Sequence, residues 1–593
     1  MPPVPLWQAA QLARQHLQAG RLGDAEHLCR QILAQFPQHA ESLNVLGVIA
    51  WQTGRHELAG DLLRQAVALA PRDAGYHNNL GTALRALGRL EEAVASCRRA
   101  AALSPNESAP YENLGNALEQ QGLLTEAVAS YEHALALEPG YLAARLGLAR
   151  ALVNLGLVRD ADAQLRRALE LDPSPAHVHS AWLANLHYLD DTTPETLLAA
   201  HRRWNQLHAL PLRSQCLPHD KDPAPDRRLR VGYVSPDFRS HPVAYFVEGL
   251  LASHDAAAVE VFCYSNAAGG DHVTARLRQY AHHWRDISAL DDAPAAALIR
   301  EDRIDILIDL SGHTAGHRLL VFARQPAPVQ VTWLGYGDTT GLDTMDYRLT
   351  DAWADPPETS GCHCTEKLVH LPETFACYRP ADDSPPVSPL PARERGHVTF
   401  ASFHTLAKLN APLLESWSRI LVRVPDARLL FCAAGLSDPA ARQRLSGFFS
   451  ERRVVAGRLE FRAWQDMREY LAAHHAVDVL LDSHPYSGHT VSCHALWMGV
   501  PPVTLAGPHY CGRTVASVLH NAGLPELIAR TPAEYEDIAV NLARDVLRLA
   551  DLRRTMRDRL AASPLLGARR FARAVEEAYR HMWRKWCERG RAK

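Results

Sequence analysis

The sequence lacks the features of a secreted, membrane-spanning or nucleic-acid-binding protein. Its 593 residues carry a formal net charge of −3, so electrostatics does not favour binding to nucleic acid or to an anionic membrane. No apolar run approaches the length that spans a bilayer. The start, Met1-Pro-Pro-Val-Pro-Leu6, has neither the basic region nor the apolar core of a secretory signal. These absences favour a cytoplasmic protein without membrane or nucleic-acid partners.

The cysteine content also favours a cytoplasmic protein. The chain has eleven cysteines but no Cys-x-x-Cys pair and no regular framework, which favours reduced thiols. Cys362-His363-Cys364 resembles a fragment of a metal motif, but no second pair of ligands accompanies it. We therefore expect no metal site and no cofactor.

The N-terminal third contains internal repeats. Blocks 7–40, 41–74, 75–108, 109–142 and 143–176 are each 34 residues long and share four positions. The glycine ends the first helix of each unit, the alanine lets two helices approach closely, and the proline stops the second helix. This pattern resembles tetratricopeptide repeats over 1–176. The shared positions are Leu12, Leu46, Leu80, Leu114 and Leu148; Gly20, Gly54, Gly88, Gly122 and Gly156; Ala25, Ala59, Ala93, Ala127 and Ala161; and Pro37, Pro71, Pro105, Pro139 and Pro173.

Such a solenoid leaves a concave face, which we expect to bind a polypeptide, although a spacer or a dimerisation arm is an alternative. Residues 177–227 remain helical in pattern and are interpreted as a helical linker. The polar, proline-rich run Leu217–Asp226 marks its end.

From residue 228 short β-type runs alternate with amphipathic helical segments, which predicts doubly wound parallel sheets. Two sets of runs predict an N-terminal half over 228–380, a linker over 381–396 and a C-terminal half over 397–593. We expect a ligand site in the cleft between the halves. An amphipathic helix over 570–583 is expected to pack across both halves. The predicted strands are Leu229–Val234, Val259–Ser265, Ile304–Leu310, Val329–Leu334, Tyr347–Thr350 and Lys367–Leu371, then Val398–Phe403, Ala427–Ala433, Leu459–Arg462, Val477–Leu481 and Pro502–Leu505.

The segment Ser487–Pro501 is the strongest single candidate for a site. A small turn, Ser487-Gly488-His489-Thr490, lies between a predicted strand and a predicted helix, where free backbone N–H groups and the helix dipole favour an anion. His489 and Thr490 stand where their side chains can join those amides around a phosphate. His494 stands about one turn deeper, where it can reach a ribose. An ordinary strand-to-helix turn predicts the same pattern.

Other strand ends carry further candidates. His241 opens the helix after the first strand and can take or donate a proton, or simply cap the helix. Gly335-Tyr336-Gly337 permits close backbone approach by a ligand, or is a plain loop. Lys408 can neutralise a leaving diphosphate, although lysines are usually solvated. Backbone groups near Gln465 can contact a base edge.

Together, the repeats and the two-part α/β unit resemble the O-linked N-acetylglucosaminyltransferase family, in particular its bacterial members. The matching stretches are Ser235–Val243, Asp305–Gly316, Gln325–Gly341, Phe400–Lys408, Val477–Pro501 and Tyr535–Ala539. The resemblance implies a GT-B fold, a nucleotide-sugar donor, and transfer to serine or threonine hydroxyls of proteins that the repeat groove binds.

The resemblance also implies roles for individual residues. His241 matches a histidine that acts as general base or orients donor and acceptor. Lys408 matches the lysine at the diphosphate, and His489 with Thr490 matches the turn that holds uridine and phosphate. Gly335, Tyr336 and Gly337 match the loop beside the transferred sugar.

The chain departs from the family pattern at four positions within the matching stretches. Val491 stands in place of a second threonine, and His494 in place of an acidic residue that grips the ribose. Gly337 replaces a proline, and Thr405 replaces a glutamine. These changes bear on the identity of the donor and its sugar.

We expect one inverting displacement that moves N-acetylglucosamine from UDP-N-acetylglucosamine to the acceptor, with Lys408 and the amides of Gly488–Val491 stabilising the departing diphosphate. Three alternatives stay open. The first is a protein O-fucosyltransferase of the SPINDLY type with a GDP-sugar donor. The second is a non-catalytic repeat adaptor. The third is a nucleotide-sugar epimerase or hydrolase, against which the repeats argue.

Overall fold

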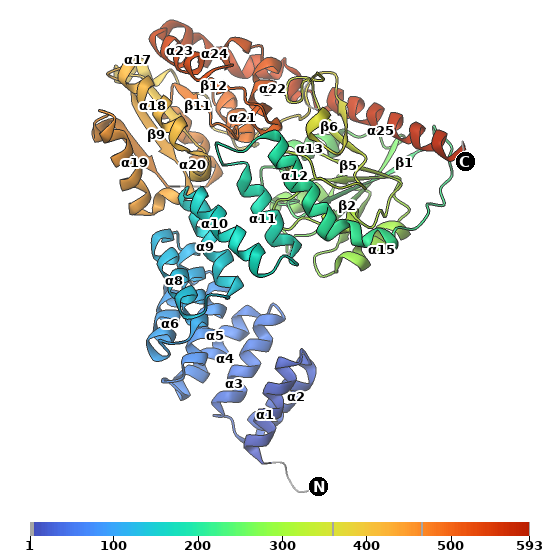
Figure 1. The fold of residues 1–593 in the computed structure, drawn as a ribbon, viewed down its shortest axis with the longest axis vertical. Coiled ribbons are helices and arrows are strands. Elements are labelled where there is room, and N and C mark those ends of the chain that lie inside the picture. The colour runs from blue at the N-terminus through green and yellow to red at the C-terminus, as the bar shows by residue number, and fades with distance from the viewer. Residues whose placement is uncertain (1–4, 268, 359–360, 464–465, 592–593) are drawn as a thin grey trace. The chain divides into compact units, whose positions relative to one another are not determined.

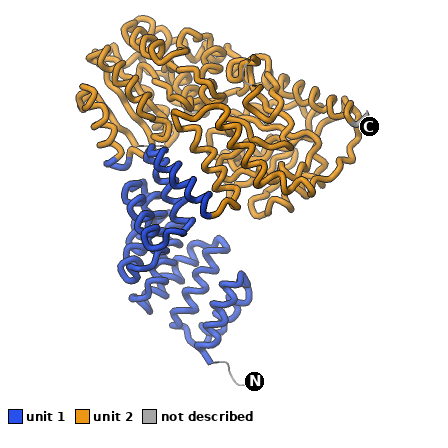
Figure 2. The backbone as a smooth tube through the Cα atoms, in the orientation of Figure 1, with its two compact units in different colours: residues 1–171, 437–440 blue, residues 172–436, 441–593 orange. Residues whose placement is uncertain are grey.

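The computed structural model describes residues 5–591 apart from 268, 359–360 and 464–465 (Figure 1). The chain divides into two compact units (Figure 2). One comprises Met1–Leu171 with Ser437–Ala440, and the other comprises Asp172–Leu436 with Ala441–Lys593. The first is a helical array, and the second contains two parallel sheets.

The first unit consists of antiparallel helix pairs stacked in chain order, as the repeat pattern predicts. The glycines that end the first helix of each pair adopt left-handed backbone angles, from φ +72° at Gly20 to φ +83° at Gly122. The repeated alanines, such as Ala59 and Ala93, are fully buried, because the two helices of a pair meet there. The helices are α1 (Leu6–Gln18), α2 (Leu22–Gln35), α3 (Ala40–Gln52), α4 (His56–Leu69), α5 (Ala74–Ala86), α6 (Leu90–Leu103), α7 (Ser108–Gln120), α8 (Leu124–Leu137), α9 (Leu142–Leu155) and α10 (Val158–Leu171).

The second unit begins with two helices, α11 (Ala176–Leu186) and α12 (Pro194–Trp204), followed by two short irregular helices, η1 (Asn205–Ala209) and η2 (Leu210–Gln215). Thr193 caps α12 by accepting a hydrogen bond from the backbone N–H of Thr196, and Pro194 fits the first helical position. The indole N–H of Trp204 donates to the carbonyl of Ala176, which ties α12 to α11.

The first sheet is entirely parallel and has the strand order β3-β2-β1-β4-β5-β6-β7 among the described residues. Its central strands are buried along most of their length, as expected for a sheet with helices on both faces. Its strands are β1 (Leu229–Ser235), β2 (Val259–Ser265), β3 (His283–Asp286), β4 (Ile306–Asp309), β5 (Val329–Thr332), β6 (Tyr347–Thr350) and β7 (Lys367–His370); its helices are α13 (Ala244–Ser253), α14 (His272–Arg278), α15 (Asp292–Glu301) and α16 (Leu319–Phe322).

The second sheet is also parallel, with the order β10-β9-β8-β11-β12-β13 in the same described part of the chain. Its strands are β8 (Thr399–Ser402), β9 (Arg428–Cys432), β10 (Leu459–Arg462), β11 (Val479–Leu481), β12 (Pro502–Leu505) and β13 (Ile528–Ala529). Its helices are α17 (Pro391–Arg395), α18 (Ala411–Arg423), α19 (Pro439–Glu451), α20 (Met467–Ala473), α21 (His489–Trp497), α22 (Thr514–Asn521), α23 (Pro532–Arg544) and α24 (Val546–Ala561).

The chain order reverses between β1 and β4 in the first sheet and between β8 and β11 in the second. Crevices at such switch points, beyond the carboxyl ends of the strands, are where doubly wound sheets bind ligands. His241 follows β1, Lys408 follows β8 and His489 follows β11. The topology therefore puts three predicted site residues at the switch points of the two sheets.

The last helix differs from its expected position. Helix α25 (Ala568–Arg591) buries Phe571, Val575, Tyr579 and Trp583 in the core of the first sheet. It lies beside that sheet in Figure 1, although it follows the second sheet in the chain. Its apolar face thus completes the N-terminal half rather than packing across both halves, which corrects the expectation.

In the described parts of the chain, no helix is both long enough and apolar enough to cross a bilayer.

Candidate active site

The turn between β11 and α21 is held by a buried carboxylate. Asp482 follows β11 directly and accepts hydrogen bonds from the backbone N–H of Gly488 (2.8 Å) and from the hydroxyl of Thr504 (2.6 Å). Burial raises the pKa of Asp482 to about 6. Gly488 passes so close to His404 that an added Cβ would lie 2.2 Å from the imidazole Cε1. The glycine is therefore required by packing within the protein.

His489 begins α21 and faces the opposite half. Its imidazole lies between the rings of Phe246 on α13 (centroids 4.6 Å apart) and Phe375 (5.0 Å), both from the first half. Burial, with a further contribution from the charge of Lys408, lowers the pKa of His489 to about 3, so the ring is neutral at physiological pH. Thr490 and Val491 are half-buried in the first turn of the same helix.

Lys408 converges on this turn from the end of β8. Its Nζ donates a hydrogen bond to the carbonyl of Ser487 (2.9 Å) and lies 3.9 Å from the centre of the Tyr486 ring. Burial lowers the pKa of Lys408 to about 8, although the carboxylate of Asp482 opposes the shift. A cation and the N-terminal end of a helix thus meet at one point, an arrangement that stabilises negative charge.

His494 lies one turn further along α21, at the depth that the sequence predicted. It is 2% exposed and its Nδ1 lies 2.7 Å from the hydroxyl of Tyr378. The rings of Tyr245 and Tyr470 lie edge-on to it. Burial lowers the pKa of His494 to about 3. The imidazole is therefore neutral and held by aromatic neighbours, a setting very different from that of a carboxylate that would grip a ribose.

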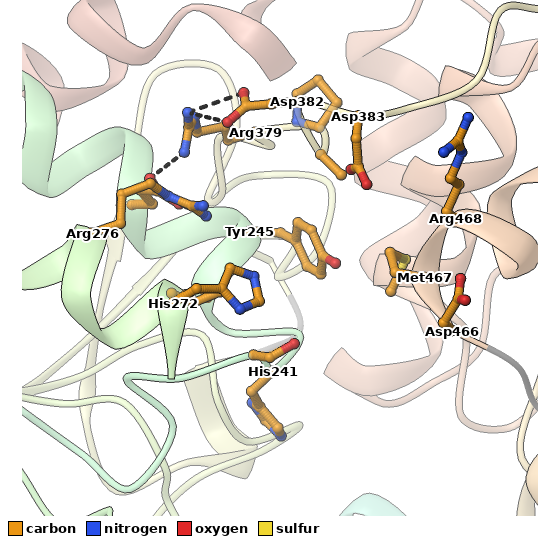
Figure 3. A pocket seen from close by; sticks show the side chains of 16 residues that line it. His241, Tyr245, His272, Arg276, Arg379, Asp382, Asp383, Asp466, Met467 and Arg468 are labelled. Carbon is orange, nitrogen blue, oxygen red and sulfur yellow. Dashed lines mark hydrogen bonds and ion pairs between the residues drawn. The ribbon is translucent and has the colours of Figure 1, made fainter. Parts of the chain in front are cut away.

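His241 lines a cavity of about 560 Å³ between the two halves (Figure 3). Its Nδ1 accepts a hydrogen bond from the backbone N–H of Val243 (3.3 Å) and lies 3.6 Å from a carboxylate oxygen of Asp237. Burial lowers the pKa of His241. The cavity is lined by Ser240, His241, Ala244, Tyr245, Glu248, His272, Val273, Arg276, Arg379, Pro380, Ala381, Asp382, Asp383, Asp466, Met467 and Arg468.

The charged residues of this cavity include a cluster that the sequence analysis missed. Buried Glu248 pairs with Arg276, whose Nη2 lies 2.9 Å from the carboxylate, and with Arg379. Glu248 and Arg276 come from separate helices and Arg379 from the end of the first half, so no local motif links them. The signal in the sequence was a single charged residue, Glu248, within the otherwise apolar segment that forms α13.

The loop Gly335–Gly341 follows β5. A Cβ at Gly335 would lie 1.7 Å from the carbonyl oxygen of Leu310, and one at Gly337 would lie 2.8 Å from the Cβ of Cys511. Both glycines therefore allow close packing of this loop against neighbouring segments of the protein. The Tyr336 side chain is buried, with its hydroxyl beside His187 and His201.

The structure thus gathers Lys408, His489, Thr490 and Val491 at one turn and puts His241 in the adjoining cavity. Gln465 lies outside the described residues. Asp466 caps α20 by accepting a hydrogen bond from the backbone N–H of Glu469. No group of three or more His, Cys, Asp or Glu side chains suited to a metal ion occurs in the portion described.

Two parallel sheets, each with a Gly-His-Thr turn at its switch point, make this unit a doubly wound α/β protein, here preceded by helical repeats. A family model described as Glycosyl transferase family 41 matches residues 178–379 and 391–575. Models of tetratricopeptide repeats match 11–74, 81–122 and 118–186. The chain belongs to glycosyl transferase family 41, and its N-terminal unit is a tetratricopeptide-repeat array.

Named relatives agree with this assignment. A rice (Oryza sativa subsp. japonica) protein named probable UDP-N-acetylglucosamine–peptide N-acetylglucosaminyltransferase SPINDLY is 40% identical over 411 residues, which cover 68% of this chain and 44% of the rice protein. A Caenorhabditis elegans UDP-N-acetylglucosamine–peptide N-acetylglucosaminyltransferase is 26% identical over 477 residues, covering 61% and 41%. The chain therefore spans less than half the length of these relatives.

A solved structure covers much more of the molecule. A variant of the Thermobaculum terrenum O-GlcNAc transferase is 39% identical, with a TM-score of 0.82, over 87% of this chain and 98% of that one.

Proposed function

We propose that this protein is an inverting glycosyltransferase that moves N-acetylglucosamine from UDP-N-acetylglucosamine to serine or threonine hydroxyls of proteins. The observation that carries the proposal is the meeting of Lys408 Nζ with the start of α21, where it donates to Ser487. Membership of the family and the printed names of the relatives above support the choice of donor and acceptor.

In the proposed reaction the acceptor hydroxyl attacks the anomeric carbon as the bond to the diphosphate oxygen breaks. The departing UDP carries the bonding electrons, and its growing charge is stabilised by Lys408 and by the first amides of α21, Gly488–Val491. These groups supply the positive potential, so the proposal needs neither a metal nor another cofactor.

His241 is proposed to act on the acceptor side. Its lowered pKa leaves the imidazole neutral at physiological pH, so that it can orient the hydroxyl or take its proton. His489, Thr490, His494 and Gln465 are proposed to contact the nucleotide, and Gly335–Gly337 the sugar.

The repeat groove is proposed to bind the acceptor polypeptide, because stacked helix pairs of this type provide an extended concave surface. The cysteine pattern favours reduced thiols, which supports the proposal that the protein acts in the cytoplasm.

The test is isothermal titration of UDP, GDP and UDP-N-acetylglucosamine into the wild type and Lys408→Ala, followed by single-turnover transfer from labelled donor to a peptide pool. UDP binding that weakens at least about tenfold in Lys408→Ala, together with label on serine or threonine, supports the proposal. Preferential binding of GDP would instead indicate fucose transfer of the SPINDLY type. Binding of no nucleotide would leave a repeat adaptor.

A further inference from the structure

The hydroxyl of Tyr336 lies between two buried imidazoles that no motif had singled out. It is 3.0 Å from Nε2 of His187, which caps the end of α11, and 2.8 Å from Nε2 of His201 on α12. His201 is fully buried and His187 is 3% exposed. Two helices that precede the first strand therefore hold the side chain of a loop that follows β5.

The hydrogen-bond partners fix where the protons lie. Nδ1 of His201 is 2.6 Å from the carbonyl oxygen of Leu197, which can only accept, so this nitrogen carries the proton. Burial lowers the pKa of His201, so the ring is neutral and its Nε2 accepts the proton of the Tyr336 hydroxyl. The Tyr336 oxygen is then left to accept a hydrogen bond from the other imidazole.

That donor is Nε2 of His187, whose pKa is also held well below its usual value by burial. The second nitrogen of His187 lies 3.8 Å from the sulfur of Cys511, which is placed to donate its thiol proton. A directed chain thus runs from Cys511 through His187, Tyr336 and His201 to the backbone of α12. Each group donates once, so loss of any member leaves a buried polar atom without its partner.

Tyr188, the residue after His187, contacts the second α/β half. The ring of Tyr188 stacks on that of Tyr486, with centroids 5.6 Å apart and 21° between the planes. Tyr486 is the ring over which Lys408 Nζ lies at 3.9 Å. The dipeptide His187-Tyr188 therefore contacts the Tyr336 loop of the first half and the Lys408 platform of the second.

We propose that His187, with His201, is a positioning residue of the transfer reaction: it fixes the loop Gly335–Gly341 relative to Lys408, so that sugar and diphosphate are held in register. This inference rests on the function proposed above, because it takes that loop as the one beside the transferred sugar. If His187 served packing alone, its loss would weaken the binding of UDP and of the nucleotide sugar equally. A positioning role instead predicts a larger effect on the nucleotide sugar.

The test compares His187→Leu with His187→Gln, whose side-chain amide can replace the Nε2–H donor. UDP and UDP-N-acetylglucosamine are titrated into each variant, and the single-turnover rate of transfer is measured. We expect His187→Leu to raise the ratio of the Kd for the nucleotide sugar to the Kd for UDP at least about fivefold and to slow transfer at least about tenfold. His187→Gln should restore both. Tyr336→Phe keeps the ring but removes the hydroxyl, and it should show the same two changes as His187→Leu. It therefore tests the proposal even if His187→Leu folds poorly.

His208→Leu is the matched control, because His208 on η1 pairs with His179 on α11 at 3.2 Å, and its ring contacts among the described residues are with His179 and Trp204 rather than with the loop. An unchanged ratio in His187→Leu and Tyr336→Phe, or equal weakening of both ligands, would overturn the positioning role. A wild type that binds neither UDP nor the nucleotide sugar would instead overturn the proposed function itself.

Discussion

The two α/β halves contain the same turn sequence at matching places, and they use it differently. Gly312-His313-Thr314 follows β4, and Gly488-His489-Thr490 follows β11, the strand in the corresponding position of the other sheet. In each turn an aspartate accepts from a glycine N–H and from a threonine on the next strand, Asp309 with Thr332 and Asp482 with Thr504. Burial raises the pKa of both aspartates to about 6.

The two histidines have opposite surroundings. His313 is turned inward, where its ring contacts the hydroxyl of Ser180 (3.0 Å) and the carbonyl of Thr340 (2.8 Å). His489 faces the other half between two phenylalanines and opens helix α21, whereas the turn at His313 leads only to the four-residue helix α16. A shared motif thus serves packing in one half, and in the other it lies where a helix N-terminus and Lys408 favour an anion.

Acid should destabilise the α/β unit more than any single substitution below. Among the described residues, burial lowers the folded-state pKa of seven of its histidines to about 4 or 3. Between pH 6.5 and about 4 the unfolded chain therefore binds protons that the folded chain does not, and stability falls as pH falls. Asp309 and Asp482 act in the opposite sense between pH 6 and 3.8, but they are outnumbered. The histidines are His404, His489 and His494, with pKa about 3, and His179, His219, His317 and His474, with pKa about 4.

We expect the free energy of unfolding to fall on the order of 5 kcal/mol from pH 6.5 to 4.5. Thermal unfolding of the nucleotide-free protein across this range measures it. A melting temperature that stays constant or rises on acidification would contradict the neutral, buried state of these imidazoles.

Lys408→Met should slow single-turnover transfer about 10²- to 10³-fold, because the departing diphosphate loses its cation. The matched control in the first half is Arg239→Met, since Arg239 follows β1 as Lys408 follows β8, and its side chain is 55% exposed. We expect that control to slow transfer less than about tenfold. If both variants slowed transfer equally, the proposal that the second half alone supplies the cation for the diphosphate would be contradicted.

Gly488→Ala and Gly312→Ala should each destabilise the protein by about 2–3 kcal/mol, because the new Cβ would meet His404 or Tyr336. Only Gly488→Ala should also weaken UDP binding, by at least about tenfold. Gly447→Ala, where an added Cβ meets nothing within 4 Å, is the control for both. Thermal unfolding and titration of UDP measure the two effects. If Gly312→Ala weakens UDP binding as much as Gly488→Ala does, the turn at Gly312 also contributes to nucleotide binding.

Gly54→Ala should have the smallest effect, a loss of about 1 kcal/mol, because the site is open and only the left-handed angle of φ +75° is unfavourable for alanine. The Kd for UDP should stay unchanged, since Gly54 belongs to the repeat unit. The measurement is the stability of the repeat unit by limited proteolysis beside UDP titration. A changed Kd would show that the repeats affect the nucleotide site.

The sequence specified the parts of the molecule whose order is local. The period of 34 residues set the helix pairs, and the expected apolar runs are confirmed as strands. Strands β3 and β13 were missed, because β3 has the polar sequence His283-Trp-Arg-Asp286 with every residue at least partly exposed, and β13 has two residues. An edge strand needs little apolar surface, so it leaves little pattern.

In the candidate site, too, the local features were predicted from the sequence and the long-range contacts were not. Lys408 and the turn at Gly488 were predicted because each lies in the segment that follows a predicted strand. The chain that links Cys511, His187, Tyr336 and His201 was not predicted, because its members come from distant segments and each looks like an ordinary core residue. The sequence likewise could not show that Gly335 is small because of Leu310, or that His494 faces tyrosines.

The most direct test of the difference between the halves is titration of UDP into His489→Ala and His313→Ala, with thermal unfolding of both. We predict that His489→Ala weakens UDP binding at least about tenfold with little loss of melting temperature. His313→Ala should leave the Kd within about threefold but lower the melting temperature, because it leaves Ser180 and Thr340 without their partner. Equal effects of the two variants on UDP, or a larger effect of His313→Ala, would contradict the assignment of the nucleotide site to the second turn.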